Sequence, residues 1–118
     1  MRKMIVVIAF VALSFLTLTP ALAEEMEMCA HESTIASLQE CVQHAYHLGH
    51  IDNQGIANSL LSKLDAAQTA LARGETTTAA NLLNAFINQV EAQAGRHISA
   101  EHAQHMIMHA QEVLAKLS

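Results

Sequence analysis

Two cysteines and eight histidines are the residues whose chemistry stands out in this chain of 118 residues. Cys29 and Cys41 would lie about 18 Å apart on one continuous helix, at ~1.5 Å per residue. A disulfide requires Cα atoms within about 7 Å of each other. The bridge can therefore form only if a helix begins near Ser33 and the residues before it fold back along that helix. We predict a Cys29–Cys41 disulfide, because the start of the chain directs export into an oxidising compartment.

The same two cysteines could instead contribute to a metal site. With His31 and His44 they supply two thiolates and two imidazoles, a ligand set that suits Zn or Cu. The spacing matches no zinc finger, and an oxidising compartment disfavours free thiolates. The metal site is therefore the alternative to the disulfide that we predict.

The histidines recur at steps of three or four positions, the spacing of residues on one face of a helix. Side chains three or four positions apart share a face of a helix, and histidine is the commonest metal ligand in proteins. The candidate metal ligands are His44, His47, His97, His102, His105 and His109. A complete site needs ligands from more than one helix, so these positions predict metal binding only if the fold brings them together.

A simpler interpretation makes these histidines solvated polar side chains. Steps of 100° around a helix centred on Ala110 place His102, His105 and His109 on one flank, beside the core and not in it. Exposed histidines have similar pKa values in the folded and unfolded chain, so stability should barely change between about pH 7.5 and 5.5. We favour this interpretation, in which the protein holds no cofactor, over a Zn or Cu site.

Catalytic motifs are missing from the sequence. It contains no His-Glu-x-x-His motif, no Gly-x-Ser-x-Gly motif and no Gly-rich phosphate loop. No recognisable pattern orients a nucleophile towards one of the histidines. We therefore expect a protein that is not an enzyme and has no catalytic residue.

Residues 1–23 have the three parts of a cleaved Sec-type signal peptide. Arg2 and Lys3 form the basic start, residues 4–18 an apolar run, and residues 21–23 a small-residue cleavage site. An apolar run of about 15 residues is shorter than the ~20 that span a bilayer, so a membrane anchor is the weaker interpretation. We expect residues 24–118 to be secreted or periplasmic, with no membrane insertion after cleavage.

The exported part of the chain is acidic. Its four basic and eleven acidic residues give a net charge of −7 when the histidines are neutral. It has no basic cluster, which argues against nucleic acid as a partner. Residues 24–32 (EEMEMCAHE) are acidic and have no apolar period, so they predict an extended lead-in to one domain of residues 33–118.

Four amphipathic segments predict an all-α domain. Each carries apolar residues at steps of three and four, and no segment alternates with period two. The predicted core stripes are Ile35, Leu38, Val42, Ala45 and Leu48; Ile56, Leu60, Leu64, Ala67 and Leu71; Leu83, Phe86, Ile87, Val90 and Ala94; and Ala103, Ile107, Ala110, Leu114 and Leu117.

Glycines and cap residues delimit these predicted helices. Gly49, Gly74 and Gly95 each follow a stripe, as expected of residues that adopt the left-handed conformation after a helix. The predicted N-caps are Ser33 or Thr34 for the first helix, Asp52 for the second and Ser99 for the fourth. The third helix is predicted to start at Thr76 or Thr77.

A short internal echo links the two halves of the domain. Gly49-His50-Ile51-Asp52 and Gly95-Arg96-His97-Ile98-Ser99 are both a Gly, a His, an Ile and a cap between two helices. The echo predicts two helical hairpins packed together, and its alternative is two helices that each end in a common type of cap.

From Thr34 to Leu117 the chain resembles the FIMAH domain. The resembling stretches are TIASLQECVQHA, GHIDNQGIANSLLSKLDAAQTAL, RGETTTAANLLNAFINQVEAQAGRHIS and HAQHMIMHAQEVL. The resemblance implies a small helical module that occurs at the C-terminal ends of secreted bacterial proteins, often hydrolases. It implies an extracellular, non-catalytic accessory role and brings no catalytic residues.

Two functional hypotheses follow. The first is a secreted accessory module that binds a protein or cell-surface partner, as the resemblance and the missing catalytic motifs indicate. The alternative is a periplasmic or extracellular protein that binds Zn, Cu or Ni through its histidines.

Overall fold

A computed structural model of the chain describes residues 32–117. This part is all-helical and contains no strand beyond isolated bridges. The four helices are α3 (Ile35–His47), α4 (Gln54–Ala72), α5 (Thr76–Gln93) and α6 (Ala100–Leu117). The predicted signal peptide and residues 24–31 of the predicted lead-in lie outside the described residues. None of the described helices is long and apolar enough to cross a membrane.

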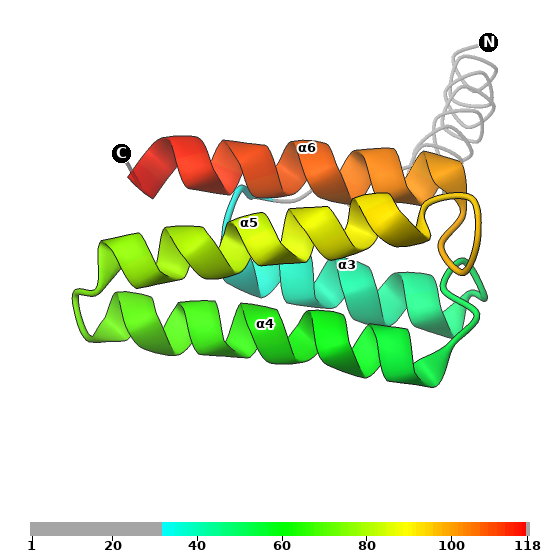
Figure 1. Cartoon of the computed structure of the whole chain (residues 1–118), viewed down its shortest axis with the longest axis horizontal. Coiled ribbons are helices and arrows are strands. Elements are labelled where there is room, and N and C mark those ends of the chain that lie inside the picture. The colour runs from blue at the N-terminus through cyan, green and yellow to red at the C-terminus, as the bar shows by residue number, and fades with distance from the viewer. Residues whose placement is uncertain (1–31, 118) are drawn as a thin grey trace, which may run out of the picture. The chain divides into compact units, whose positions relative to one another are not determined.

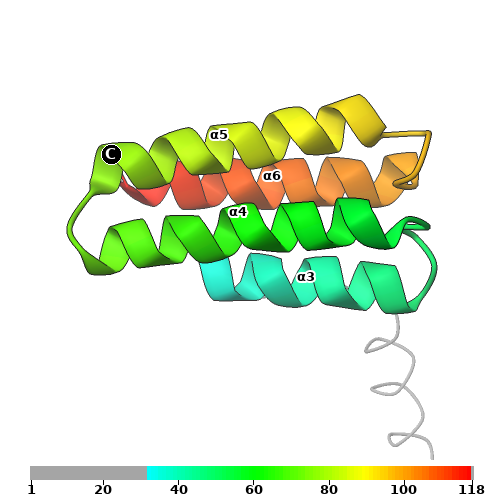
Figure 2. The ribbon, with the colours of Figure 1, turned by 60° about the horizontal axis from the view of Figure 1, so that its bottom comes forward.

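The helices form an antiparallel four-helix bundle (Figures 1 and 2). Each helix packs against two neighbours, in the cyclic order α3, α4, α5, α6 and back to α3. The loops 48–53 and 94–99 lie at one end of the bundle, which we call the junction end. The turn 73–75 between α4 and α5 lies at the other end, which we call the open end.

The apolar stripes of the four helices meet in one core. The largest side chains of this core are fully buried and come from all four helices and both loops of the junction end. They include Phe86, Leu38, Ile51, Leu60, Leu64, Leu83, Ile98, Met106, Val42 and Val90. The stripe predicted for α5 is correct from Leu83 to Val90, which confirms its period of three and four.

Three of the predicted stripes contain errors. Leu48 is 54% exposed, because it lies past the last turn of α3, and the buried Ile51 of the following loop takes the inward position instead. On α4 the buried alanines Ala57 and Ala70 replace their larger neighbours Ile56 and Leu71, which are only partly buried.

On α6 the core face is rotated relative to the prediction. Met106 and Val113 are buried beside Ala103 and Ala110, while Ile107, Leu114 and Leu117 are only partly buried. The rotation carries His102 and His109 into the buried face, with 5% and 7% exposure. The expectation that these two histidines lie beside the core and outside it is therefore wrong.

Side-chain caps begin three of the helices. The hydroxyl of Thr34 accepts the amide N–H of Ser37 at 3.1 Å, and Ser99 caps α6 through the amide of His102. The predicted cap Asp52 is wrong, because Asn53 caps α4 by accepting the amide N–H of Ile56 at 3.0 Å.

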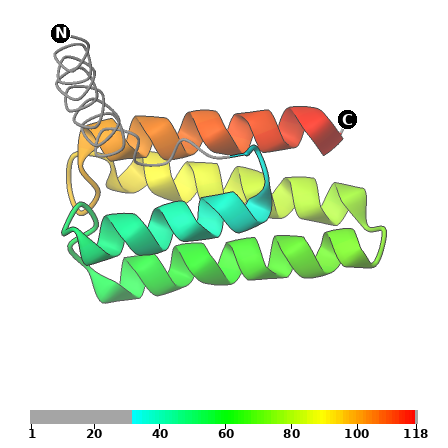
Figure 3. The same ribbon diagram turned by 180° about the vertical axis from the view of Figure 1, so that it is seen from behind.

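Helix α3 is the short member of the bundle. It has 13 residues, against 18 or 19 in the other three helices, so it is shorter by about 8 Å at ~1.5 Å per residue. Its C-terminal end is level with the junction end, and its N-terminal end stops part-way along α4 (Figure 3). The missing length is therefore at the open end.

Candidate functional site

At the junction end the two echoing loops pair with each other (Figure 1). The amide of Asp52 donates to the carbonyl of His97 at 3.0 Å, and the amide of Ser99 donates to the carbonyl of His50 at 2.9 Å. These two hydrogen bonds flank an antiparallel bridge between Ile51 and Ile98. The short sequence echo therefore marks two loops that contact each other and join α3–α4 to α5–α6.

Two glycines allow the chain to enter these loops. Gly49 and Gly95 have φ values of +85° and +79°, in the left-handed region that a residue with a Cβ atom rarely adopts. After each glycine the chain turns back so that an isoleucine enters the core, with 1% of Ile51 and of Ile98 exposed. The glycines thus fix the loops whose side chains make up the histidine cluster of the junction end.

His102 is the centre of that cluster. Its ring stacks on the ring of His50, with a distance of 3.7 Å between ring centroids and an angle of 15° between planes. Its Nδ1 lies 2.9 Å from the hydroxyl oxygen of Ser99, the cap of the same helix. A neutral His102 fits this arrangement, because its Nδ1 can then accept a hydrogen bond from the serine hydroxyl.

Burial lowers the pKa of His102 below its ordinary value of 6.5, and the adjacent His50 lowers it further. Glu101 raises this pKa, while His105 and His44 lower it, each by less than His50 does. The histidines around His102 therefore disfavour its charged form, and at neutral pH it packs as an uncharged ring.

A second histidine of the junction end forms an exposed pair. The Nδ1 of His97 lies 2.8 Å from a carboxylate oxygen of Asp52, and both side chains are largely exposed. This contact explains why Asp52 is not a helix cap: its carboxylate points to the neighbouring loop, and the following asparagine caps α4.

His109 has a different role, because it holds the segment that enters the bundle. Its Nε2 lies 2.8 Å from the carbonyl oxygen of Glu32, at hydrogen-bond distance. One residue later the hydroxyl of Ser33 donates to the carboxylate of Glu112 at 2.9 Å. Two side chains of α6 therefore fix the chain immediately before α3.

The six candidate metal ligands do not meet in one place. His102 stacks on His50, which the prediction left out; His97 pairs with Asp52, and His109 contacts Glu32. Stacked parallel rings direct their nitrogen lone pairs within separate planes, so they cannot converge on one ion. Within residues 32–117 no group of three or more His, Cys, Asp or Glu residues is placed to hold a metal ion.

The remaining candidate ligands of the sequence have the following positions. His44, His47 and His105 have exposed side chains on α3 and α6. Cys41 is buried in α3, with 1% exposure, and is not a free thiol. Cys29 and His31 lie outside the described residues, so the Cys29–Cys41 disulfide stays a prediction.

The open end carries an apolar groove that the sequence analysis did not foresee. Its volume is about 480 Å³, within the usual range of ligand pockets. Because α3 is short, α4 and α6, which are diagonal to each other in the bundle, both reach this groove. It is lined by Ser33, Thr34, Ile35, Ala36, Gln68, Leu71, Ala72, Val113, Lys116 and Leu117.

A second hollow of about 310 Å³ lies next to the first. It lies between the start of α5 and the end of α6 and is lined by Thr76, Thr77, Ala80, Leu114 and Leu117. Leu117 lines both hollows and therefore forms the ridge between them. Together they make the open end an apolar surface with two depressions.

The signal for this surface is present in the sequence as a difference in helix length. The cap at Thr34 and the glycine at position 49 bound a helix that is shorter than its partners by about a turn and a half. What the sequence does not state is which helices flank the missing turns.

Comparison with known proteins identifies one family. The model of the FIMAH domain matches residues 35–115, which cover all four described helices almost completely. No curated protein and no solved structure matches the chain.

Proposed function

Because the chain belongs to the FIMAH domain family, we propose that it is a secreted, non-catalytic accessory module that binds a partner protein through the groove at its open end. FIMAH domains are small helical modules that occur in secreted bacterial proteins. The signal-peptide pattern of residues 1–23 supports export of this chain.

The observation that carries the proposal is the apolar groove left by the short helix α3. The buried side chains of Ile35 and Val113 form its floor, and the partly buried Leu71 and Leu117 contribute apolar surface that a longer α3 would cover. A domain of this size gains stability from every apolar side chain that it buries, so an apolar groove that none of residues 32–117 fills points to a surface that binds another molecule. The junction end, by contrast, uses its loops to cover its own core.

Site-specific photo-crosslinking in bacteria that secrete the protein tests the proposal. Gln68 is exposed on α4 and lines the groove, so it is replaced by p-benzoyl-phenylalanine. The matched control carries the same group at Asn88, which is exposed on α5 away from both hollows. We expect a crosslinked partner from position 68 and none from position 88.

A groove-filling variant makes the result specific. Ala72 is exposed and lines the groove, so Ala72→Trp fills it from the solvent side without disturbing the core. The crosslink from position 68 should disappear in this variant, while its far-UV circular dichroism and melting temperature stay close to the parent values. A crosslink that persists in Ala72→Trp, or that forms equally from position 88, contradicts binding through the groove.

A further inference from the structure

The two hollows of the open end and their single charged side chain define the chemistry of the partner. We propose that the open end binds one short segment of a partner protein that carries two apolar side chains and a carboxylate. This inference rests on the proposed function and specifies which kind of segment the groove accepts.

The two hollows lie next to each other at the open end. They adjoin along Leu117 in the last turn of α6, and apolar residues such as Ile35, Leu71 and Leu114 line them. Two adjacent depressions on either side of one ridge match two apolar side chains from one backbone. Amphipathic segments bind grooves in this way, with apolar anchors at i and i+3 or i+4.

A positive charge lies at the rim of the groove. Lys116 is the one charged residue among those that line the two hollows in the described part of the chain, and it is exposed at the rim. The carboxylate of Glu112, one turn earlier on α6, already accepts a hydrogen bond from Ser33. The ammonium group of Lys116 is therefore placed to pair with a carboxylate of the bound segment.

The backbone of α3 adds to this preference. Thr34, Ile35 and Ala36 line the groove, and they form the N-terminal end of α3. This end carries partial positive charge, and the first turn of α3 contains no acidic residue of its own; the carboxylate of Glu112, bonded to Ser33, offsets part of this charge. Both contributions favour a negatively charged segment over a basic one, and Lys116 is the one that a substitution can remove.

The acidic lead-in of the same chain is the competing occupant. Before α3, Glu32 contacts His109 and Ser33 contacts Glu112, one turn further along α6. Residues 32–34 therefore approach the groove from the side of α6 that lies towards the junction end. Occupation by Met26 and Met28 is kept as an outcome of the test.

Selection of peptides on the purified protein tests the inference. A phage-displayed library of random dodecapeptides is selected on residues 24–118 and, in parallel, on the Ala72→Trp variant. We expect peptides that are enriched on the parent protein alone and that share two apolar residues and an Asp or Glu. Equal enrichment on both proteins, or a shared motif without an acidic residue, overturns the inference.

The affinity of the protein for one synthetic copy of an enriched peptide then tests the contribution of the Lys116 charge. Lys116→Gln should weaken its binding about two- to fivefold, the range for an exposed ion pair, and added salt should reduce the difference. Lys63→Gln is the matched control, because Lys63 lies on α4 outside both hollows, where its ammonium group donates to Ser59. Equal effects of the two substitutions contradict the ion pair.

A double variant decides between partner and lead-in. If Met26→Ser with Met28→Ser raises the affinity for the peptide tenfold or more, the lead-in occupies the groove and the inference of a partner segment is wrong. An unchanged affinity supports it. If position 68 crosslinks a partner but the enriched peptides lack a carboxylate, the proposed function holds and only this inference fails.

Discussion

At the junction end of the bundle, two loops bond to each other and cover the core, whereas at the open end the short helix α3 leaves Leu71 and Leu117 only partly buried among the described residues. The loops bury Ile51 and Ile98 almost completely, and Leu117 at the opposite end stays partly exposed between two hollows. The two ends differ in chain connectivity, since two hydrogen-bonded loops meet at the junction end and a single three-residue turn connects helices at the open end.

The histidines follow the same division. Three histidines lie at the junction end and make contacts there. His102 stacks on His50 and contacts Ser99, and His97 pairs with Asp52. No histidine lines either hollow of the open end. The stacked pair of His50 and His102 is therefore separate from the surface that we propose for binding.

The largest expected effect comes from the core that both ends share. Phe86 is fully buried on α5, so Phe86→Ala should lower the free energy of unfolding by about 3–5 kcal/mol. Asn88→Ala, on the exposed face of the same helix, should cost little. Urea denaturation of the two variants measures the difference, and similar losses would contradict the assignment of the core face.

The next effect separates the two ends. Ile98→Ala should cost about 2–5 kcal/mol, because it empties a fully buried position behind the paired loops. Leu117→Ala should cost about 1 kcal/mol or less, because that side chain is already partly in water. If urea denaturation gives equal losses, the open end is as well packed as the junction end and the comparison fails.

Helix caps provide a smaller test of the same comparison. Ser99→Ala and Thr34→Ala each remove one cap, at the junction end and the open end respectively, and a cap contributes about 0.5–2 kcal/mol. Each hydroxyl also makes a second hydrogen bond, Ser99 with Nδ1 of the buried His102 and Thr34 with the hydroxyl of Ser37. Ser99→Ala should be the more costly of the two, because a serine hydroxyl can rotate towards another partner whereas the buried Nδ1 cannot. A larger loss for Thr34→Ala would argue against a tightly linked junction end.

The smallest expected effect is the dependence of stability on pH. Since the pKa of His102 is lowered in the folded protein, the unfolded chain takes up its proton first as the pH falls through 6.5. The free energy of unfolding should therefore decrease on acidification. The contribution of His102 to this decrease should end below the pKa that its ring has in the folded protein. This replaces the flat dependence that exposed histidines predict.

Thermal melts across about pH 7.5 to 5.0 measure this effect. His102→Asn should flatten the dependence on pH, while the control His47→Asn, at an exposed histidine of α3 that does not act on His102, should leave it unchanged. If the parent protein and His102→Asn lose stability in parallel, the buried ring is not the group that responds.

Much of the fold could be predicted from the sequence, because its signals are local. The period of three and four, the glycines at positions 49, 74 and 95, and the serine cap of the last helix indicate the helices and their ends without knowledge of the packing. The family resemblance is likewise visible in the residues and is confirmed by the match over residues 35–115.

What the sequence could not give depends on contacts between distant segments. His102 is buried because the loop of His50 covers it, and this pairing lies between residues about fifty positions apart. Asp52 and Asn53 are both good caps, and only the position of His97 decides between them. The groove requires knowing that α4 and α6 flank the missing turns of α3.

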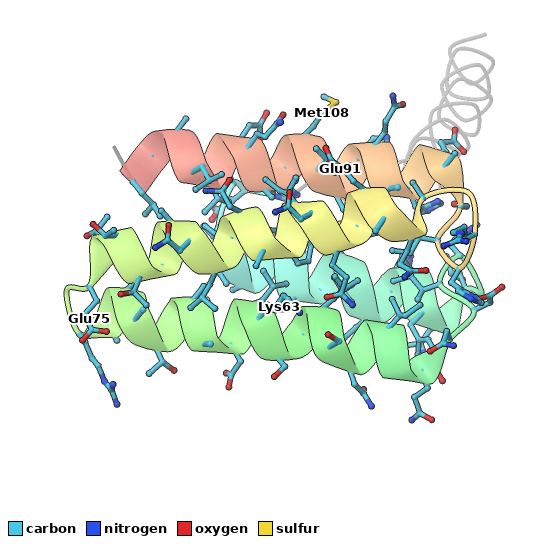
Figure 4. The ribbon with its side chains drawn as sticks, in the orientation of Figure 1. Lys63, Glu75, Glu91 and Met108 are labelled. Carbon is cyan, nitrogen blue, oxygen red and sulfur yellow. The ribbon has the colours of Figure 1, made fainter. Side chains whose placement is uncertain are left out.

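Two large apolar side chains of the described residues are exposed outside the hollows. Leu48 follows the last turn of α3 at the junction end, with 54% exposure. Met108 points away from the bundle on the outer face of α6, with 58% exposure (Figure 4). It is isolated among polar neighbours, and single exposed apolar residues are ordinary on protein surfaces. The apolar surface that we propose for partner binding is the one at the open end.

Mapping the bound peptide by NMR tests most directly the claim that the open end binds and the junction end is structural. Uniformly ¹⁵N-labelled residues 24–118 are titrated with an enriched peptide, and amide shifts are followed at both ends. The account predicts the largest changes at Ala36, Ala72 and Leu117, with the amides of Asp52 and Ser99 unmoved. Largest changes at Asp52 and Ser99 would contradict it.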